Sequence, residues 1–479
     1  MHHTIIRNAD WVIEWDGKRH AYRRHIDILI EDDHILKLEP EIRLQSAKLV
    51  NEIDGRGFLV MPGLIDLHSH PATEPGYRGV REDHGNLEHH MASLYERFQA
   101  FQLSEVGRKA ALEIAYGELM QSGVTTVCDL TFPIAGWDDI LRRSGMRVYV
   151  APGYASGRWV MKNKVEIGYK WDEQAGELLF ERAVGLIERL EKDSSGLFRG
   201  MVYPAQIDTT SEHLFRKGID YARATKRPIT THASQSIIEF WEIARRHAMT
   251  PVQWLHKIGF LGPNASLGHC IFIDEHSSIH WHTHSDIALL AETGTTVAHC
   301  PSPFARYGEH LENIGKYQQR GVNIGIGTDV SPHNLIEEMR LAIVLGRVHA
   351  RDIRAANTQS VFNAATIGGA KALGREDLGR LAPGTKADFL MVDLQHPTMT
   401  PARDPLRALV WSGADRPIRH VYVDGRAIVR DYRPVGLSFV EAAGILAQEQ
   451  ERMLVDAPLR DYAGREAEMI APLSLAMEN

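Results

Sequence analysis

The chain has 479 residues, 44% apolar and 24% charged, which is the composition of a globular protein and excludes a disordered or fibrous one. Asp and Glu outnumber Lys and Arg by 62 to 54, so the formal charge is −8, and nucleic-acid binding is not expected. No apolar run reaches the ~20 residues of a transmembrane helix, and no signal peptide is evident. The three cysteines do not suggest a disulfide framework, so we expect a cytoplasmic protein without membrane association.

The N-terminal segment is predicted to form short strands at residues 3–7, 10–14, 25–31 and 34–38, where apolar and polar residues alternate. The same pattern returns near the other end, at residues 386–393, 420–423 and 426–430. We therefore expect one small β-sandwich built from residues 1–57 and 385–437. Residues 438–479 are predicted to form a helical tail, with a solvated face at 448–452.

Between these ends, short apolar runs alternate with helix-like stretches such as 105–121 and 211–225. There are eight such runs: 57–67, 123–130, 146–152, 200–207, 228–232, 265–270, 295–300 and 322–329. Eight strand–helix units in ~270 residues are typical of a closed (β/α)₈ barrel. The sequence thus predicts an α/β protein with a TIM barrel at 58–384, and an insertion within 153–199.

Polar side chains close five of the eight runs. The first run is followed by His68 and His70, and later runs end in His232, His269, His299 and Asp329. In a barrel these positions meet at the C-terminal face, where active sites form. Histidines two apart on a strand point the same way, and three histidines plus an aspartate can hold a divalent metal with a position open for water.

At these residues the chain resembles the amidohydrolase superfamily. Residues 61–70 (MPGLIDLHSH) resemble its first-strand signature, and 298–301 (AHCP) and 327–340 (GTDVSPHNLIEEMR) resemble its branch of atrazine-degrading hydrolases and cytosine/adenosine-type deaminases. Residues 379–392 and 423–425 resemble its C-terminal sandwich. The resemblance implies that His68, His70, His232 and Asp329 bind the metal. It also implies that His269 contacts the substrate or the attacking water, and that Asp329 carries the proton.

The resemblance also bears on the number of metal ions. Members with two metals use a carboxylated lysine late in the fourth strand, and residues 201–208 contain no lysine. We therefore expect one divalent ion. Zinc is the first choice, but this ligand set also suits iron, cobalt or manganese.

One departure from the family concerns the reaction. Deaminases of this branch carry Glu three residues after the fifth-strand histidine, where this chain has Gln235, which holds no titratable proton. Glu239 and Glu242 are expected to lie too far along the next helix. This favours hydrolysis of an amide, urea or carbamate-type C–N bond. The alternatives are an aminohydrolase of a triazine, pyrimidine or purine-like ring and, less favoured because every ligand is kept, a non-enzymatic scaffold.

The partner is expected to be a small-molecule substrate, bound by a homodimer or higher homo-oligomer. Substrate contacts are predicted for Gln235, His299, Phe304 and Tyr307, and core positions for Cys270 and Cys300. Trp241 is expected to pack between helices. Two interpretations stay open for each remaining group of histidines. One group is either a set of polar loop residues or a second metal site: His276, His280, His282 and His284. The other is either a set of polar loop residues or in contact with the substrate: His84, His89 and His90.

Overall fold

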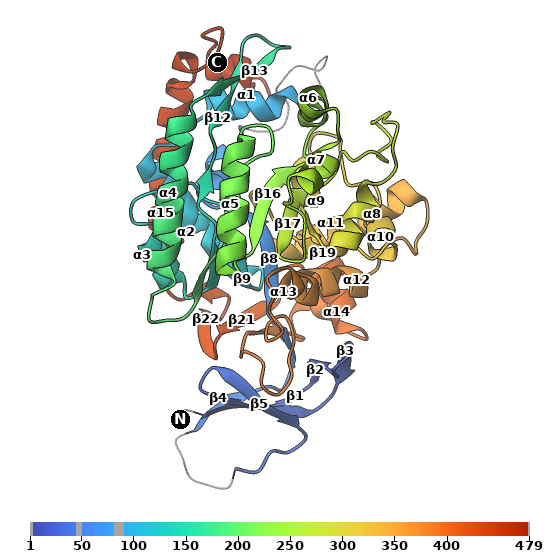
Figure 1. The fold of residues 1–479 in the computed structure, drawn as a ribbon. Coiled ribbons are helices and arrows are strands. Elements are labelled where there is room, and N and C mark those ends of the chain that lie inside the picture. The colour runs from blue at the N-terminus through green and yellow to red at the C-terminus, as the bar shows by residue number, and fades with distance from the viewer. Residues whose placement is uncertain (1–2, 45–49, 81–90, 478–479) are drawn as a thin grey trace.

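The structure is a computed structural model that describes residues 3–44, 50–80 and 91–477. It is an α/β protein in which helices surround a barrel of parallel strands, and a β-sandwich lies at one end of that barrel (Figure 1). None of the described helices has the length and apolar character needed to cross a membrane.

The barrel is formed by two four-stranded parallel sheets that close on each other. Their orders are β14-β10-β9-β8 and β16-β17-β18-β19. Parallel bridges join Ser69 to Asp329 and Val202 to Ile229, with the Asp329 amide 2.8 Å from the His68 carbonyl oxygen. The eight strands are β8 (Leu64–Ser69), β9 (Val124–Asp129), β10 (Arg147–Val150), β14 (Phe198–Gly200), β16 (Ile229–Ala233), β17 (Ala265–His269), β18 (Thr296–His299) and β19 (Asn323–Ile326).

Helices follow the strands, and their starts are set by capping side chains. The Ser211 hydroxyl accepts from the Leu214 amide at the start of α5, and the Asn334 side chain accepts from the Glu337 amide at the start of α11. The outer helices are α2 (Glu105–Gln121), α3 (Trp137–Ser144), α4 (Glu173–Leu190), α5 (Glu212–Thr225), α6 (Ile237–His247), α7 (Pro251–Lys257), α8 (Asp286–Thr293), α10 (Ile314–Gln319) and α11 (Leu335–Ala350).

The sandwich draws on both ends of the chain. One sheet has the order β5-β4-β1-β6 and the other the order β23-β22-β21-β20-β7-β2-β3. In the second sheet, β7 pairs with β20 in antiparallel fashion, with Pro62 opposite Phe389. The strands are β1 (His3–Ala9), β2 (Trp11–Trp15), β3 (His20–Arg23), β4 (Ile26–Glu31), β5 (His34–Glu39), β6 (Val50–Asp54), β7 (Phe58–Pro62), β20 (Phe389–Asp393), β21 (Ile418–Val423), β22 (Arg426–Arg430) and β23 (Arg433–Pro434).

The predicted first barrel strand, 57–67, is two strands. β7 belongs to the sandwich and β8 to the barrel, and Gly63 separates them. A Cβ on Gly63 would lie 2.1 Å from Thr125 Oγ1, so only glycine allows this close approach to the neighbouring strand. The backbone here therefore leaves one sheet and enters the other within a single residue.

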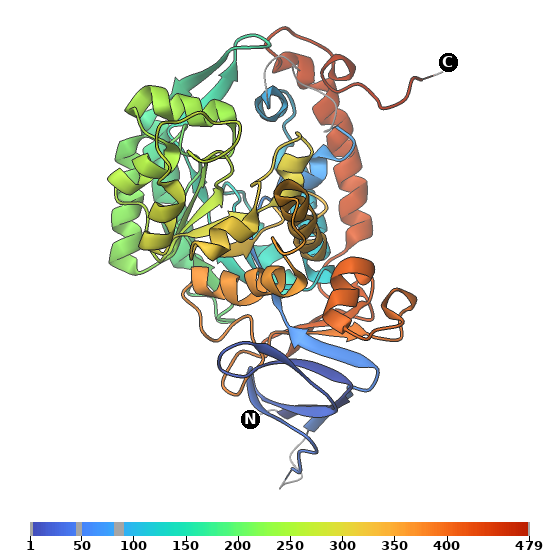
Figure 2. The ribbon, with the colours of Figure 1, turned by 90° about the vertical axis from the view of Figure 1, so that its right-hand side faces the viewer.

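The predicted insertion contains a hairpin, β12 (Gly157–Met161) and β13 (Ile167–Trp171). With α1 (Ala92–Ala100) it lies at the end of the barrel opposite the sandwich (Figure 1). The tail forms α15 (Phe439–Val455), which runs along the barrel against α2 (Figure 2). The face at 448–452 is not simply solvated, because the Gln450 amide donates to the carbonyl oxygens of Gly76 and Arg78 at 2.8 Å.

Candidate metal centre

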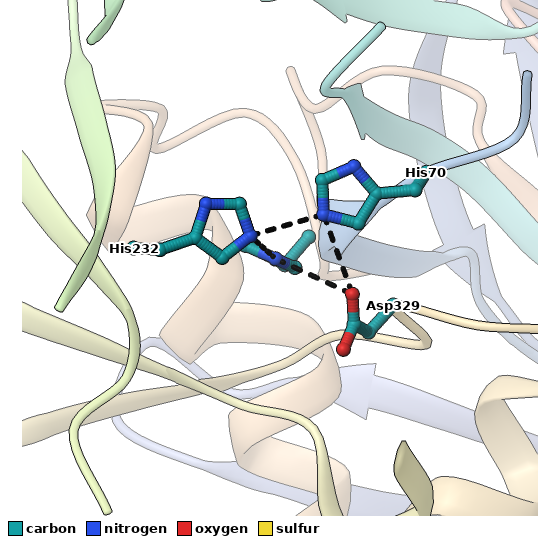
Figure 3. Close-up of side chains that lie close together, drawn as sticks. His70, His232 and Asp329 are labelled. Atoms are coloured by element: carbon teal, nitrogen blue, oxygen red, sulfur yellow. Dashed lines mark hydrogen bonds and ion pairs between the residues drawn. The ribbon is translucent and has the colours of Figure 1, made fainter. Parts of the chain in front are cut away.

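Three imidazoles and one carboxylate converge at the C-terminal mouth of the barrel (Figure 3). His68 and His70 come from the end of β8, His232 from β16, and Asp329 from the turn after β19. The Nε2 atom of His232 lies 3.0 Å from Nε2 of His68 and 3.0 Å from Nε2 of His70. Asp329 Oδ1 lies 3.4 Å from His70 Nε2. All four possible ligand atoms lie within 4.8 Å of one another.

Hydrogen bonds behind two of the rings fix their tautomers. His70 Nδ1 lies 3.1 Å from the Leu130 carbonyl oxygen, and His232 Nδ1 lies 2.7 Å from the Ala205 carbonyl oxygen. A carbonyl oxygen only accepts, so each Nδ1 carries the proton and each Nε2 presents a lone pair. Two lone pairs 3.0 Å apart repel each other unless a cation lies between them. This observation fits a metal ion at ~2.0–2.1 Å from each nitrogen, with second-shell carbonyls orienting the ligands.

Burial keeps these imidazoles in the form that binds metal. It lowers the pKa of His70 and of His232 to about 4, and the pKa of His68 well below its ordinary value. Desolvation disfavours the imidazolium form in each case. Neutral imidazole is the metal-binding species, so no proton has to be removed from these rings near neutral pH.

Asp66 connects the two segments that carry ligands, and the sequence reasoning missed it. Its carboxylate is fully buried and accepts from the His68 amide at 3.0 Å, and from the amide and hydroxyl of Thr328 at 3.2 and 2.6 Å. Burial raises the pKa of Asp66 to about 6. An acid inside the otherwise apolar strand 64–67 was the signal that could have revealed it.

The backbone at the strand ends adopts conformations that most residues avoid. Ser234, His269 and Asp329 have φ of 57°, 82° and 58°, in the left-handed region that is uncommon for residues other than glycine. Asp329 lies three residues beyond the end of β19, although the sequence placed it at the end of that strand. Such strained positions cluster at functional sites, and here they mark the mouth of the barrel.

A cavity opens from this centre. Its walls include His70, His232 and Asp329, together with four residues predicted to act on the substrate: Gln235, His269, Phe304 and Tyr307. His269 Nε2 lies 3.9 Å from Asp329 Oδ2, and its ring meets Phe304 edge to face with centroids 4.4 Å apart. The Tyr307 hydroxyl is buried and has no hydrogen-bond partner within the described part of the chain.

His299, a predicted substrate contact, and Glu239, which was expected to be too distant, do not line the cavity. His299 is buried at the end of β18 but is not among the residues that line the cavity. Glu239 is also fully buried, and its carboxylate accepts from the amides of Ser234 at 2.5 Å and Gln235 at 3.4 Å. It therefore holds the loop after β16, and Gln235 is the side chain of this loop that faces the cavity.

The remaining candidates do not form a second metal site in the described residues. The only converging group found there is the one at the mouth, so His276, His280, His282 and His284 are not part of such a group. Cys270 and Cys300 are buried and unpaired, as expected. Trp241 was expected between helices but is 45% exposed on α6. His84, His89 and His90 lie outside the described residues.

The barrel and its converging ligands define a class, the metal-dependent hydrolases with a (β/α)₈ fold. A sequence profile described as "Amidohydrolase family" matches residues 59–428. The chain belongs to this family. It is accordingly a metal-dependent enzyme that hydrolyses carbon–nitrogen bonds other than peptide bonds, and its His/Asp group is suited to a divalent ion.

Individual relatives extend over nearly the whole chain. A 5'-deoxyadenosine deaminase of Methanosarcina mazei is 28% identical over 456 residues, which are 94% of this chain and 98% of the relative. An adenosine deaminase structure from Xanthomonas campestris, with bound zinc, has a TM-score of 0.79 at 20% identity and covers 94% and 98% of the two chains. A zinc complex of an atrazine chlorohydrolase from Arthrobacter aurescens has a TM-score of 0.77 at 24% identity, covering 93% and 100%. These structures share the fold.

Proposed function

We propose that this protein is a mononuclear zinc enzyme that removes an amino group from a small N-heterocycle by hydrolysis. One observation supports it most: the Nε2 lone pairs of His70 and His232 face each other 3.0 Å apart beside the Asp329 carboxylate. The deaminase relatives support the choice of an amino group on a heterocycle. Phe304 and Tyr307, which line the cavity, provide apolar surface for a flat ring.

The proposed chemistry assigns a task to each side chain at the mouth. A divalent ion bound by His68, His70, His232 and Asp329 would bring the pKa of water down to ~7. Asp329 accepts the proton of the attacking water and delivers it to the departing nitrogen. His269, beside Asp329, stabilises the charge that develops on oxygen.

Gln235 favours a second candidate function. Its amide, which donates to Gln206 Oε1 at 3.3 Å, can hold a ring nitrogen by a hydrogen bond but cannot protonate it. Hydrolysis of an amide, urea or carbamate needs no ring protonation, because Asp329 alone can move the proton. This reaction is therefore the second candidate, and a substrate panel must distinguish it from deamination of a ring.

We also propose a single zinc ion, a small-molecule substrate, a homodimer or higher homo-oligomer, and a cytoplasmic location. The absence of lysine among the described residues that line the cavity supports one ion, and the zinc-bound structural neighbours support zinc over iron, cobalt or manganese. The free, buried cysteines support a reducing compartment. Oligomeric state is a prediction for measurement in solution.

Metal content tests the centre directly. In His70→Ala we expect bound zinc to fall well below one ion per chain and turnover to fall with it, because one ligand of the proposed set is removed. His213→Ala is the control, since this histidine is 74% exposed on α5. Elemental analysis and activity are measured on the same preparations. Full metal content with full activity in His70→Ala would contradict the proposed site.

A substrate panel separates the two functions. Ammonia release from 5'-deoxyadenosine and adenosine is compared with amine release from simple amides and ureas. We expect the wild-type enzyme to release ammonia from an aminated ring. Gln235→Glu should accelerate that reaction ~10²-fold or more, because it supplies a general acid. If the wild type cleaves only amides or ureas, the second candidate is the function.

A further inference from the structure

We propose that the cavity contains an oxyanion subsite formed by Arg97 and Arg108, and that the substrate carries a carboxylate or phosphate group bound there. The inference rests on the proposed function, because it takes the cavity beside the metal centre as the substrate site. Arg97 lies on α1 and Arg108 on α2, and both line this cavity together with His70 and His232.

Arg97 is a buried cation packed against two aromatic rings. The residue is 1% exposed, and its Cζ lies 4.7 Å from the ring centroid of Tyr77 and 4.6 Å from that of Phe98. Both rings lie within cation–π distance of the guanidinium and so restrict where it can move. They hold the Arg97 side chain in its place in the wall of the cavity.

Two donors of the Arg97 guanidinium are unused. Nε and Nη1 of Arg97 are buried and make no hydrogen bond to any described residue. The Glu74 carboxylate lies 3.5 Å from Nη1, a distance that gives charge attraction but not a good hydrogen bond. A buried guanidinium with open donors is unfavourable by itself. An oxyanion within reach of these donors would supply the missing acceptors.

Arg108 adds a second open donor to the same wall. Its Nη2 donates to the Phe132 carbonyl oxygen at 2.7 Å, while its Nε is buried without a hydrogen-bond partner in the described chain. Besides Asp329 of the metal centre, the charged side chains among the described residues that line the cavity are Glu74, Arg97 and Arg108. Their formal charges leave a net charge of +1, which favours an anionic group on the ligand.

The experiment measures binding of three probes by calorimetry: benzoate, phenyl phosphate and the neutral benzamide. The proteins are the metal-loaded wild type, Arg97→Gln, Arg108→Gln and the control Arg216→Gln, an exposed residue of α5. We expect at least one anionic probe to bind the wild type and Arg216→Gln equally, and ~10-fold or more weakly to each cavity variant. Benzamide binding should not change among the four. The tighter anion identifies the group that the substrate carries.

Two further measurements keep the result interpretable. Arg108 is only partly buried, so Arg108→Gln tests the subsite if Arg97→Gln fails to fold, which thermal unfolding reports. Binding is repeated on wild-type protein from which the metal has been removed with a chelator, where anion affinity should persist if the arginines hold the anion. The inference is overturned if no anion binds the wild type, if both arginine variants bind as the wild type does, or if binding disappears with the metal.

These outcomes are distinct from failure of the proposed function. Arginine-dependent anion binding by an enzyme that cleaves no C–N bond in the substrate panel would leave the subsite standing and remove the proposed reaction. Turnover of neutral heterocycles with no arginine-dependent anion binding would support the proposed reaction and remove the subsite. If both the reaction and the subsite are confirmed, a substrate with the anionic group should show a raised KM in Arg97→Gln, while its neutral analogue should not.

Discussion

At the residue scale, the position of the His68 ring depends on Gly268, which lies in β17. A Cβ on Gly268 would lie 2.6 Å from His68 Cε1 and 3.0 Å from its Nδ1. Unlike His70 and His232, His68 has no hydrogen bond at Nδ1 within the described residues. Its ring is therefore oriented by packing, and Gly268 provides the space that the ring needs.

The substitution Gly268→Ala should weaken metal binding without unfolding the protein. The added methyl group displaces the His68 ring from the position in which Nε2 faces the other ligands, and we expect zinc affinity to fall by ~10–100-fold. Competition with a chromophoric chelator measures the affinity. Gly262→Ala is the matched control, because a Cβ there meets no atom within 4 Å. Equal affinities in the two variants would contradict this role of Gly268.

At the element scale, much of the barrel could be predicted because its strands are buried on both faces. Such strands appear as unbroken apolar runs. β9, β17 and β18 fall within the predicted runs, and β16 extends one residue beyond its run. The histidines that follow those runs identified the mouth. The short edge strand β3 was not predicted, because only four residues form it and none is fully buried.

Features that depend on tertiary contacts could not be predicted. The change of sheet at Gly63 is set by its approach to Thr125, and no local pattern reports it. Arg97 lies in an ordinary helical stretch, and its importance comes from aromatic rings and a cavity brought together by folding. Asp329 was identified by its motif, but its left-handed backbone was not.

A buried acid at the start of α8 makes stability depend on pH. Asp286 accepts from the Thr250 hydroxyl at 2.8 Å and the Asp274 amide at 3.0 Å. Burial, followed by the negative charge of Asp274, raises the pKa of Asp286 to about 7. The folded state therefore holds this proton at a pH where the unfolded chain, with a pKa of ~3.9, has lost it. The contribution of Asp286 to stability is present below pH ~4 and is lost as pH rises to about 7.

The substitution Asp286→Asn should remove this dependence, because the amide is neutral at every pH and can still accept from the Asp274 amide. Between pH 4.5 and 7.5 we expect the free energy of unfolding of the wild type to decline relative to the variant by on the order of 2–4 kcal/mol. Urea unfolding at several pH values measures it, with the exposed Asp139→Asn as control. Parallel pH profiles for wild type and Asp286→Asn would show that this carboxyl is not responsible.

At the scale of the whole molecule, helix α15 of the C-terminal tail packs against the outside of the barrel. α15 covers α2 through a cluster of buried apolar residues, and the Phe439 ring occupies the space beside Gly117, where a Cβ would lie 2.0 Å away. The shared cluster consists of Ala110, Ala111, Ile114, Ala442 and Leu446. The tail also reaches the segment after His70 through the hydrogen bonds of Gln450.

Deletion of residues 438–479 should therefore destabilise the enzyme. It exposes the apolar face of α2, and we expect a loss of roughly 3 kcal/mol or more in the free energy of unfolding. Deletion of residues 472–479, which follow the last helix, α16 (Ala467–Ile470), is the control and should leave stability within ~0.5 kcal/mol. Thermal unfolding followed by circular dichroism compares the two. Equal midpoints would show that α15 contributes little to the fold.

The antiparallel pairing of Pro62 with Phe389 has a consequence for synthesis on the ribosome. At ~5–20 residues per second, the partner of β7 is translated tens of seconds after β7 itself. During that interval one edge of the nascent sheet is open to pairing with other chains. A fragment that stops before β20 keeps this edge permanently, so incomplete products of translation should aggregate more readily than the finished enzyme.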